Sequence, residues 1–190
     1  MRLTFHATLS LAAALLLTSA TSAAAQSAGR FTLTSSDLKP GGTIAARHVA
    51  NTFGCSGQNV SPALQWSGAP AGTKSFAVTA YDPDAPTGSG FWHWVVYNIP
   101  ASTTSLAAGA GSKGGSLPAG ATQGNTDVSQ PGYLGPCPPA GDKPHRYIFT
   151  VYALKTARIE VPANATGALV GFNIHGNQLG KATLTARYGR

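Results

Sequence analysis

Acidic residues are scarce in this chain. Only six of its 190 residues are Asp or Glu, against 13 Lys and Arg, so the formal net charge is +7. The basic residues are scattered and form no run of Lys or Arg. This pattern argues against a nucleic-acid-binding stripe, and it favours a solubilising role over attraction for acidic surfaces. We therefore expect no nucleic-acid partner.

Long apolar runs are absent after the first 25 residues. Within those residues, Arg2 precedes an apolar run from Leu9 to Leu17, and Ser22 to Ala25 are small residues that precede Gln26. This layout is typical of a secretory signal peptide and is too short for a transmembrane helix, although an uncleaved membrane anchor is the alternative. We expect residues 1–25 to be a signal peptide and the protein to be periplasmic or secreted, not membrane-spanning.

The expected mature chain, residues 26–190, is long enough for one domain. Removal of 25 of the 190 residues leaves 165, and the loss of Arg2 lowers the net charge from +7 to +6. A chain of this length can bury a sizeable core but is short for two domains. We expect a single domain over residues 26–190.

Cysteine is also rare, with only Cys55 and Cys137 in the chain. An even count in an oxidising compartment predicts one disulfide. Such a bridge would close a long loop and contribute about 4 kcal/mol in the chain-entropy model. A free thiol and half of a metal site are the alternatives.

Helical periodicity is scarce, whereas Gly and Pro are abundant, at 23 and 13 residues. Residues 101–132, rich in Gly, Ser, Ala and Thr, are typical of a long surface excursion. Short apolar runs bounded by turn residues predict a mostly β domain. The expected strands are Phe76–Tyr81, Trp92–Ile99, His145–Leu154 and Ala182–Tyr188.

One helix is predicted from about residue 164 or 166 to residue 178. Leu169, Phe172 and Leu179 would share one face of this helix, and Gly180 is a natural stop after it.

Three short segments concentrate the chemically active side chains: Asp82-Pro83-Asp84-Ala85-Pro86, then Trp92-His93-Trp94, then Gly135-Pro136-Cys137-Pro138-Pro139 followed by His145-Arg146-Tyr147. Proline fixes φ, so the first segment reads as a rigid turn that holds its carboxylates in place. These segments suggest a small polar pocket.

Strand alternation orients several of these side chains. His145 and Tyr147 fall on one strand face and Arg146 on the other, while His93 falls opposite its two Trp neighbours. Asp82 and Asp84 would share a side. The pattern therefore permits a pocket lined by two His, one Tyr and one or two Asp.

Anion binding is the chemistry that we favour for this pocket. Two imidazoles and a phenol can donate hydrogen bonds to an anion, provided that at least one of the carboxylates is occupied by a His or an Arg, or is protonated. Pairing of Arg146 with Asp84 would supply a structural anchor of this kind.

Other chemistries have weaker support. Two His with Asp suit a metal, but the spacing lacks a motif such as His-Glu-x-x-His. A Ser hydrolase would need a Gly-x-Ser-x-Gly elbow, and Cys137 could act as a nucleophile with His145 as base only without the disulfide. A further alternative is that these residues simply hold turns together. We expect no catalytic residue, no metal and no cofactor.

Taken together, these segments resemble the signature segments of the phosphatidylethanolamine-binding protein family, and most closely its exported bacterial Raf-kinase-inhibitor-like members. Further agreement comes from Phe53–Pro62, Ala71–Phe76 and Gly167–Phe172. The similar segments occur in the family's order and cover nearly the whole mature chain.

The resemblance implies a mostly β domain with two antiparallel sheets packed as in a β-sandwich and a few short helices, one near the C-terminus. It also implies a small pocket that accepts phosphate, acetate or a phospholipid headgroup. Eukaryotic relatives often have Gly-Pro-Pro at the rim, so Cys137 is a departure, and a bridge to Cys55 would tether the rim. Carried over by motif, the ligand-binding residues are Asp82, Asp84, Pro86, His93, Gly135, Pro138, Pro139, His145 and Tyr147.

The sequence therefore predicts a small exported binding protein whose partner is a small anion or a phospholipid headgroup. The alternative is an inhibitor or modulator that docks surface loops onto a protein partner of kinase or protease type.

Overall fold

The computed structural model describes Met1 and residues 29–190, so the predicted signal peptide lies almost entirely outside the described residues. The described chain forms two antiparallel sheets and one α-helix, which confirms the predicted mostly β, two-sheet architecture. The small sheet has the order β1 (Thr32–Thr34), β2 (Leu64–Ser67), β5 (Ser105–Leu106). The large sheet has the order β6 (Thr122–Gln123), β4 (Phe91–Pro100), β3 (Ser75–Asp82), β7 (His145–Leu154), β8 (Gln178–Tyr188).

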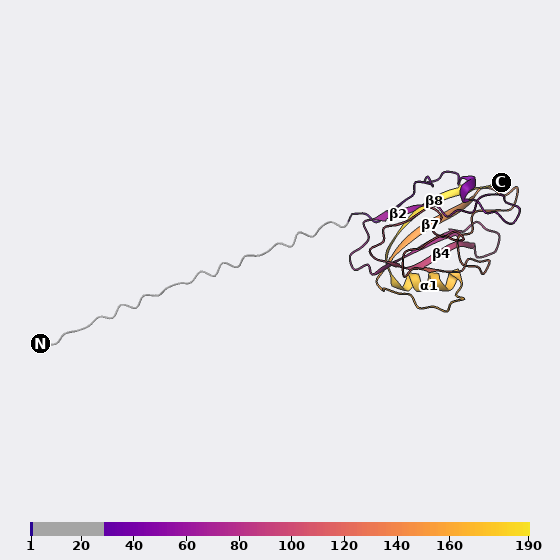
Figure 1. The fold of residues 1–190 in the computed structure, drawn as a ribbon. Helices are drawn as coiled ribbons and strands as arrows, with labels where there is room; N and C mark the ends of the chain where they lie inside the picture. The colour runs from indigo at the N-terminus through magenta and orange to yellow at the C-terminus, as the bar shows by residue number, and fades with distance from the viewer. Residues whose placement is uncertain (2–28) are drawn as a thin grey trace.

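The large sheet is covered on both faces. Successive strand residues point to opposite faces, so alternate residues of β3 enter different cores. Phe76 and Val78 pack toward the small sheet with its Leu64 and Trp66, whereas Ala77 packs in a second core with α1 (Gly167–Asn177). Figure 1 shows α1 along one side of the large sheet, away from β2.

Strand β4 departs from regular alternation at two points. The pairing with β3 shifts register between Ala80 and Tyr81, opposite Trp94 and Trp92, which leaves His93 as an extra residue. A bulge of this kind changes which face the following side chains enter. Trp94 accordingly packs between the sheets and Trp92 against the helix-side core. The prediction that His93 lies opposite both Trp neighbours is therefore wrong.

The helix forms close to its predicted place but buries a different face. Thr166 caps it, since its hydroxyl oxygen accepts a hydrogen bond from the Leu169 N–H at 3.2 Å. The buried residues are Gly167, Val170 and Ile174, whereas Phe172 is 77% exposed. The expected Leu169–Phe172–Leu179 face is wrong because Gly167 allows the helix to approach Trp92 closely, and a Cβ there would lie 2.6 Å from the indole.

Two other boundaries differ from the predicted ones. The last strand begins at Gln178, directly after α1, so Gly180 lies inside β8 and does not end the helix. The segment 101–132 is more than a surface excursion, because it adds β5 to the small sheet and β6 to the large one. Its Leu106 is 2% exposed in the core between the sheets.

Among the described residues, no helix has both the length and the apolar character that crossing a membrane requires.

Candidate functional site

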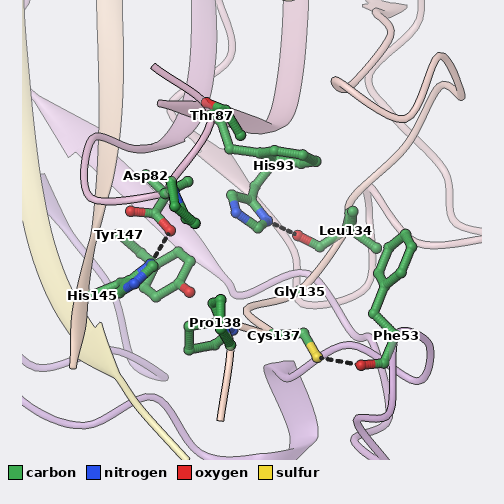
Figure 2. A pocket seen from close by; sticks show the side chains of 14 residues that line it. Phe53, Asp82, Thr87, His93, Leu134, Gly135, Cys137, Pro138, His145 and Tyr147 are labelled. Carbon is green, nitrogen blue, oxygen red and sulfur yellow. Dashed lines mark hydrogen bonds and ion pairs between the residues drawn. The ribbon is translucent and has the colours of Figure 1, made fainter. Parts of the chain in front are cut away.

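A cavity of about 210 Å³ opens at the edge of the large sheet where β3 ends and β4 and β7 begin. Antiparallel pairing brings these strand ends together, so distant segments of the sequence meet there. The cavity is lined by eight of the nine residues predicted to bind a ligand: Asp82, Pro86, His93, Gly135, Pro138, Pro139, His145 and Tyr147. Figure 2 shows these polar side chains facing the rim formed by Gly135, Cys137 and Pro138.

At the inner end of the cavity, Asp82 and His145 form a buried pair. The Nδ1–H of His145 donates to Asp82 Oδ2 at 2.7 Å, and the two side chains are 3% and 5% exposed. The other carboxylate oxygen accepts from the Asp84 N–H at 2.8 Å, which is the turn that the Asp-Pro segment predicts. Both oxygens of Asp82 therefore have partners within the protein. The Nε2 of His145 lies 3.5 Å from Asp142 Oδ2, outside the cavity.

Asp84, the ninth predicted residue, does not line the cavity. Its carboxylate accepts from the Nε and Nη2 of Arg146 at 2.9 and 2.6 Å, and from the Arg146 backbone N–H at 2.8 Å. The prediction of this anchor is confirmed. The hydrogen bonds from Arg146 lower the pKa of Asp84 to about 2. The expectation that Asp82 and Asp84 share a side is wrong, because they pair with side chains on opposite faces of β7.

His93 lies in the bulge of β4 and is held by its main-chain neighbours. Its Nδ1–H donates to the Leu134 carbonyl at 2.8 Å, so Nε2 is the nitrogen left for a ligand. The ring also contacts two aromatic side chains, Phe91 at 4.8 Å and Tyr147 at 5.2 Å between ring centroids. Burial lowers the pKa of His93, so the imidazole is neutral at neutral pH.

Tyr147 carries the polar group of the cavity that is least satisfied. The residue is 1% exposed, and its hydroxyl has no hydrogen-bond partner among the described residues. Burial, together with the charge of Asp82, raises the pKa of Tyr147, so the phenol keeps its proton. A buried hydroxyl without a partner is uncommon and needs an explanation.

The rim of the cavity is tied to the loop that contains Cys55. Cys137 forms a disulfide with Cys55, as predicted. Arg190 links the same two segments, since its guanidinium donates to the carbonyls of Pro138, Gly54 and Phe53 at 2.7, 3.1 and 3.3 Å. This network holds Phe53 at the mouth of the cavity, 61% exposed and with a positive φ of 56°.

Position 135 at the rim requires a glycine for steric reasons. A Cβ at this position would collide with the carbonyl of His48, so a larger residue would push the rim away from the chain beneath it. The Gly135 N–H donates to Asn59 Oδ1 at 2.7 Å. Because that N–H is already occupied, Gly135 shapes the cavity and does not offer its amide to a ligand.

Sequence reasoning missed five cavity-lining residues: Phe53, Ala85, Thr87, Phe91 and Leu134. All five lie in or within two residues of segments that were singled out, so proximity was the only available signal. Phe91 is one example, two residues before His93. Leu134 acts through its main-chain carbonyl, which no side-chain pattern indicates.

Two side chains of the lining that could act as nucleophiles are engaged within the protein. Cys137 is in the disulfide, and the Thr87 hydroxyl donates to the carbonyl of Gly90. Within the part of the chain that the structure describes, no group of three or more His, Cys, Asp or Glu is placed to hold a metal ion.

A family model described as phosphatidylethanolamine-binding protein matches residues 34–189. The chain is 54% identical over 162 residues to the UPF0098 protein YbcL of Escherichia coli, covering 85% of this chain and 88% of the relative. It is 53% identical over 156 residues to the UPF0098 protein YbhB of the same organism, covering 82% and 98%.

Solved structures show the same fold. The crystal structure of Escherichia coli YbcL, described as a new member of the mammalian PEBP family, superimposes with a TM-score of 0.82 and 53% identity, covering 84% of this chain and 98% of that one. A homologue from Chlamydia trachomatis gives a TM-score of 0.69 at 29% identity, covering 84% of this chain and 97% of that one.

The putative lipoprotein LppC of Mycobacterium tuberculosis is a further sequence relative, 39% identical over 137 residues, covering 72% of this chain and 63% of the relative.

Proposed function

The chain belongs to the phosphatidylethanolamine-binding protein family, and from that premise we propose that it is an exported binding protein whose cavity holds a small anionic group, such as phosphate or a phospholipid headgroup. The observation that carries the proposal is the Tyr147 hydroxyl, a buried donor without a partner in the cavity that also holds His93. A ligand oxygen that accepts from this hydroxyl would satisfy it.

The carboxylates near the cavity are compatible with an anion. Asp82 and Asp84 would repel an anion if they were free, but Asp82 is hydrogen-bonded by His145 and the Asp84 N–H, and Asp84 is paired with Arg146. The polar groups that remain open are therefore the Tyr147 hydroxyl and the Nε2 of His93. A protonated imidazole donates from both nitrogens, so His93 can add a second hydrogen bond to an anion.

The mouth of the cavity suits a ligand with an apolar part. Phe53, Phe91, Leu134 and Pro86 lie among the lining residues and present hydrocarbon around the polar end. Sites of this kind commonly combine an apolar lining with a few polar groups that orient the ligand. This arrangement fits a phosphate ester better than free phosphate, because only the ester would fill both parts of the cavity.

Export is the second part of the proposal. It is supported by the signal-peptide pattern of residues 1–25, by a relative named as a putative lipoprotein, and by the Cys55–Cys137 disulfide. Structural disulfides persist in oxidising compartments such as the periplasm. We propose binding without catalysis, since the Thr87 hydroxyl and the Cys137 sulfur are already engaged within the protein.

An inhibitor or modulator role is the second candidate. The observation that favours it is Phe53, which is 61% exposed and is held in place by the disulfide and Arg190. A rigidly presented aromatic side chain is a typical anchor for a protein partner. In this case the partner would contact the rim, and Phe53→Ala would weaken inhibition while His93→Asn would not.

The test is isothermal titration with phosphoethanolamine and with inorganic phosphate. His93→Asn is the variant of choice, because the Asn amide can still donate to the Leu134 carbonyl while Nε2 is lost. His145→Ala is a poor choice, since it would leave the buried Asp82 without its partner. Glu160→Gln, an exposed carboxylate paired with Arg158, controls for the loss of a charged or polar group elsewhere.

We expect both ligands to bind the unaltered protein and the Glu160→Gln variant, phosphoethanolamine more tightly, and His93→Asn to weaken both by about tenfold or more. Absence of heat in the unaltered protein, or equal binding in His93→Asn, would refute the proposal.

A further inference from the structure

A second cavity lies on the far side of His145, and it is basic. It has a volume of about 610 Å³ and is lined by Asp84, Asp142, Lys143, Pro144, His145, Arg146 and Arg187. His145 lines both cavities, with Nδ1 bonded to Asp82 of the first and Nε2 near Asp142 of the second. We call this second cavity the basic cleft.

Two arginines of the basic cleft lie side by side, although their positive charges repel each other. Arg146 on β7 and Arg187 on β8 are directly paired across the two strands. Like charges in this position destabilise a sheet unless another charge lies between or beside them. Asp84 neutralises Arg146 through two side-chain hydrogen bonds. No equivalent carboxylate serves Arg187.

Two of the three cations in the basic cleft therefore have no carboxylate partner among the described residues, and the cleft carries one more cation than carboxylates. In the part of the chain that the structure describes, no carboxylate lies within 4.0 Å of the side-chain nitrogens of Lys143 or Arg187. Of the two carboxylates in the lining, Asp84 is occupied by Arg146, and Asp142 lies beside His145. Lys143 and Arg187 are consequently the two lining cations that are open to an anionic ligand.

We propose that the basic cleft is a second anion site, with Lys143 and Arg187 as its cationic ligands. Its ligand is a polyanion with at least two adjacent negative groups, phosphoryl or carboxylate. Two separate cations are best matched by two negative groups, and the cleft is larger than the first cavity, at about 610 Å³ against about 210 Å³. This inference does not depend on what the first cavity binds.

Asp142 places a negative charge in the lining of this site. Its carboxylate is 43% exposed and lines the basic cleft, so it repels an anion seated between Lys143 and Arg187. Its removal should therefore tighten binding, which is the reverse of the effect of removing a cation. This opposite sign separates a real site from a general surface effect.

The experiment is isothermal titration of the full protein with inorganic pyrophosphate and, separately, with citrate. Arg187→Ala and Lys143→Ala are each expected to weaken binding about tenfold or more, as loss of a charged contact does. Asp142→Asn is expected to strengthen it. Tyr147→Phe alters only the first cavity and should leave this binding unchanged. A preference for pyrophosphate or for citrate identifies the phosphoryl or the carboxylate class.

Lys181→Ala is the matched control for charge, because Lys181 lies on the same strand as Arg187 but opposite Tyr152, toward the other end of the sheet. An equal loss in Lys181→Ala and Arg187→Ala would reduce the effect to net charge and overturn the proposal. Binding that is lost in Tyr147→Phe but kept in Arg187→Ala would place the polyanion in the first cavity and would also overturn it. Absence of binding to both probes at millimolar concentration would have the same meaning.

Discussion

Tyr147→Phe should make the protein more stable and worse at binding. The substitution removes only the hydroxyl, which is buried and has no hydrogen-bond partner among the described residues. The ring stays packed between the sheets with Phe149 and Val151, so no cavity is created. An unpaired buried hydroxyl destabilises a protein by about 1 kcal/mol or more. Its removal should therefore raise the free energy of unfolding by about 1 kcal/mol and the Tm by about 2–4 °C.

Binding should change in the opposite direction. A hydrogen bond from this hydroxyl to a charged ligand is worth about 1.5–3 kcal/mol, which corresponds to a loss of about tenfold to a hundredfold in affinity. The assays are urea denaturation of the free protein and titration with phosphoethanolamine, both on the same preparations.

Tyr133 supplies a matched control. It is also a buried tyrosine, but its hydroxyl donates to the His48 carbonyl at 2.9 Å. Tyr133→Phe should therefore lower the free energy of unfolding by about 1 kcal/mol and leave binding nearly unchanged. If Tyr147→Phe instead lowered stability as Tyr133→Phe does, or left affinity intact, the reasoning about the open hydroxyl would be refuted.

Three further predictions concern protonation, the disulfide and the helix. Burial lowers the pKa of His93, so below about pH 6.5 this side chain is protonated more readily in the unfolded chain than in the folded one, and acidification should lower the free energy of unfolding. A bound anion favours the protonated ring. The affinity for the anion should therefore rise as the pH falls, and binding should be accompanied by proton uptake. Titration in buffers of different ionisation enthalpy measures that uptake, and a pH-independent affinity would contradict it. Joint replacement of Cys55 and Cys137 by Ser removes the constraint that the bridge places on the unfolded chain, and it should lower the free energy of unfolding by about 4 kcal/mol. Guanidinium denaturation measures this loss. An unchanged denaturation midpoint would show that the bridge does not constrain the unfolded chain. On α1, replacement of the buried Ile174 by Ala should lower the free energy of unfolding by about 2–5 kcal/mol, whereas Phe172→Ala, on the exposed side, should lower it by less than about 0.5 kcal/mol. A larger loss for Phe172→Ala than for Ile174→Ala would show that the buried and exposed sides of the helix are wrongly assigned.

Local rules were sufficient for several parts of the fold. Alternation along residues 145–151 correctly placed His145 and Tyr147 on one face and Arg146 on the other, because β7 pairs regularly with β8 over that stretch. The Asp-Pro turn formed as expected, since Asp82 accepts from the backbone N–H two residues later. These features depend on neighbouring residues only.

The parts that sequence reasoning missed depend on tertiary contacts. The bulge at His93 arises from the register between β3 and β4, which no property of Trp92-His93-Trp94 shows. The face predicted for Leu169, Phe172 and Leu179 does not form a packing surface of α1, because Leu179 lies in β8 and the helix approaches Trp92 through Gly167 and Gly171. The strands β5 and β6 contain two residues each, too few for a periodic pattern.

The central claim is that an anionic group binds in the cavity formed by His93, Gly135 and Tyr147. Amide chemical-shift mapping by two-dimensional NMR, with phosphoethanolamine titrated into the isotopically labelled protein, tests its location directly. We predict saturable shifts for the amides of residues 91–93, of Leu134, Gly135 and Cys137, and of residues 145–147, with those of α1 unchanged. Shifts confined to α1 or to the small sheet, or no shift at millimolar ligand, would contradict the claim.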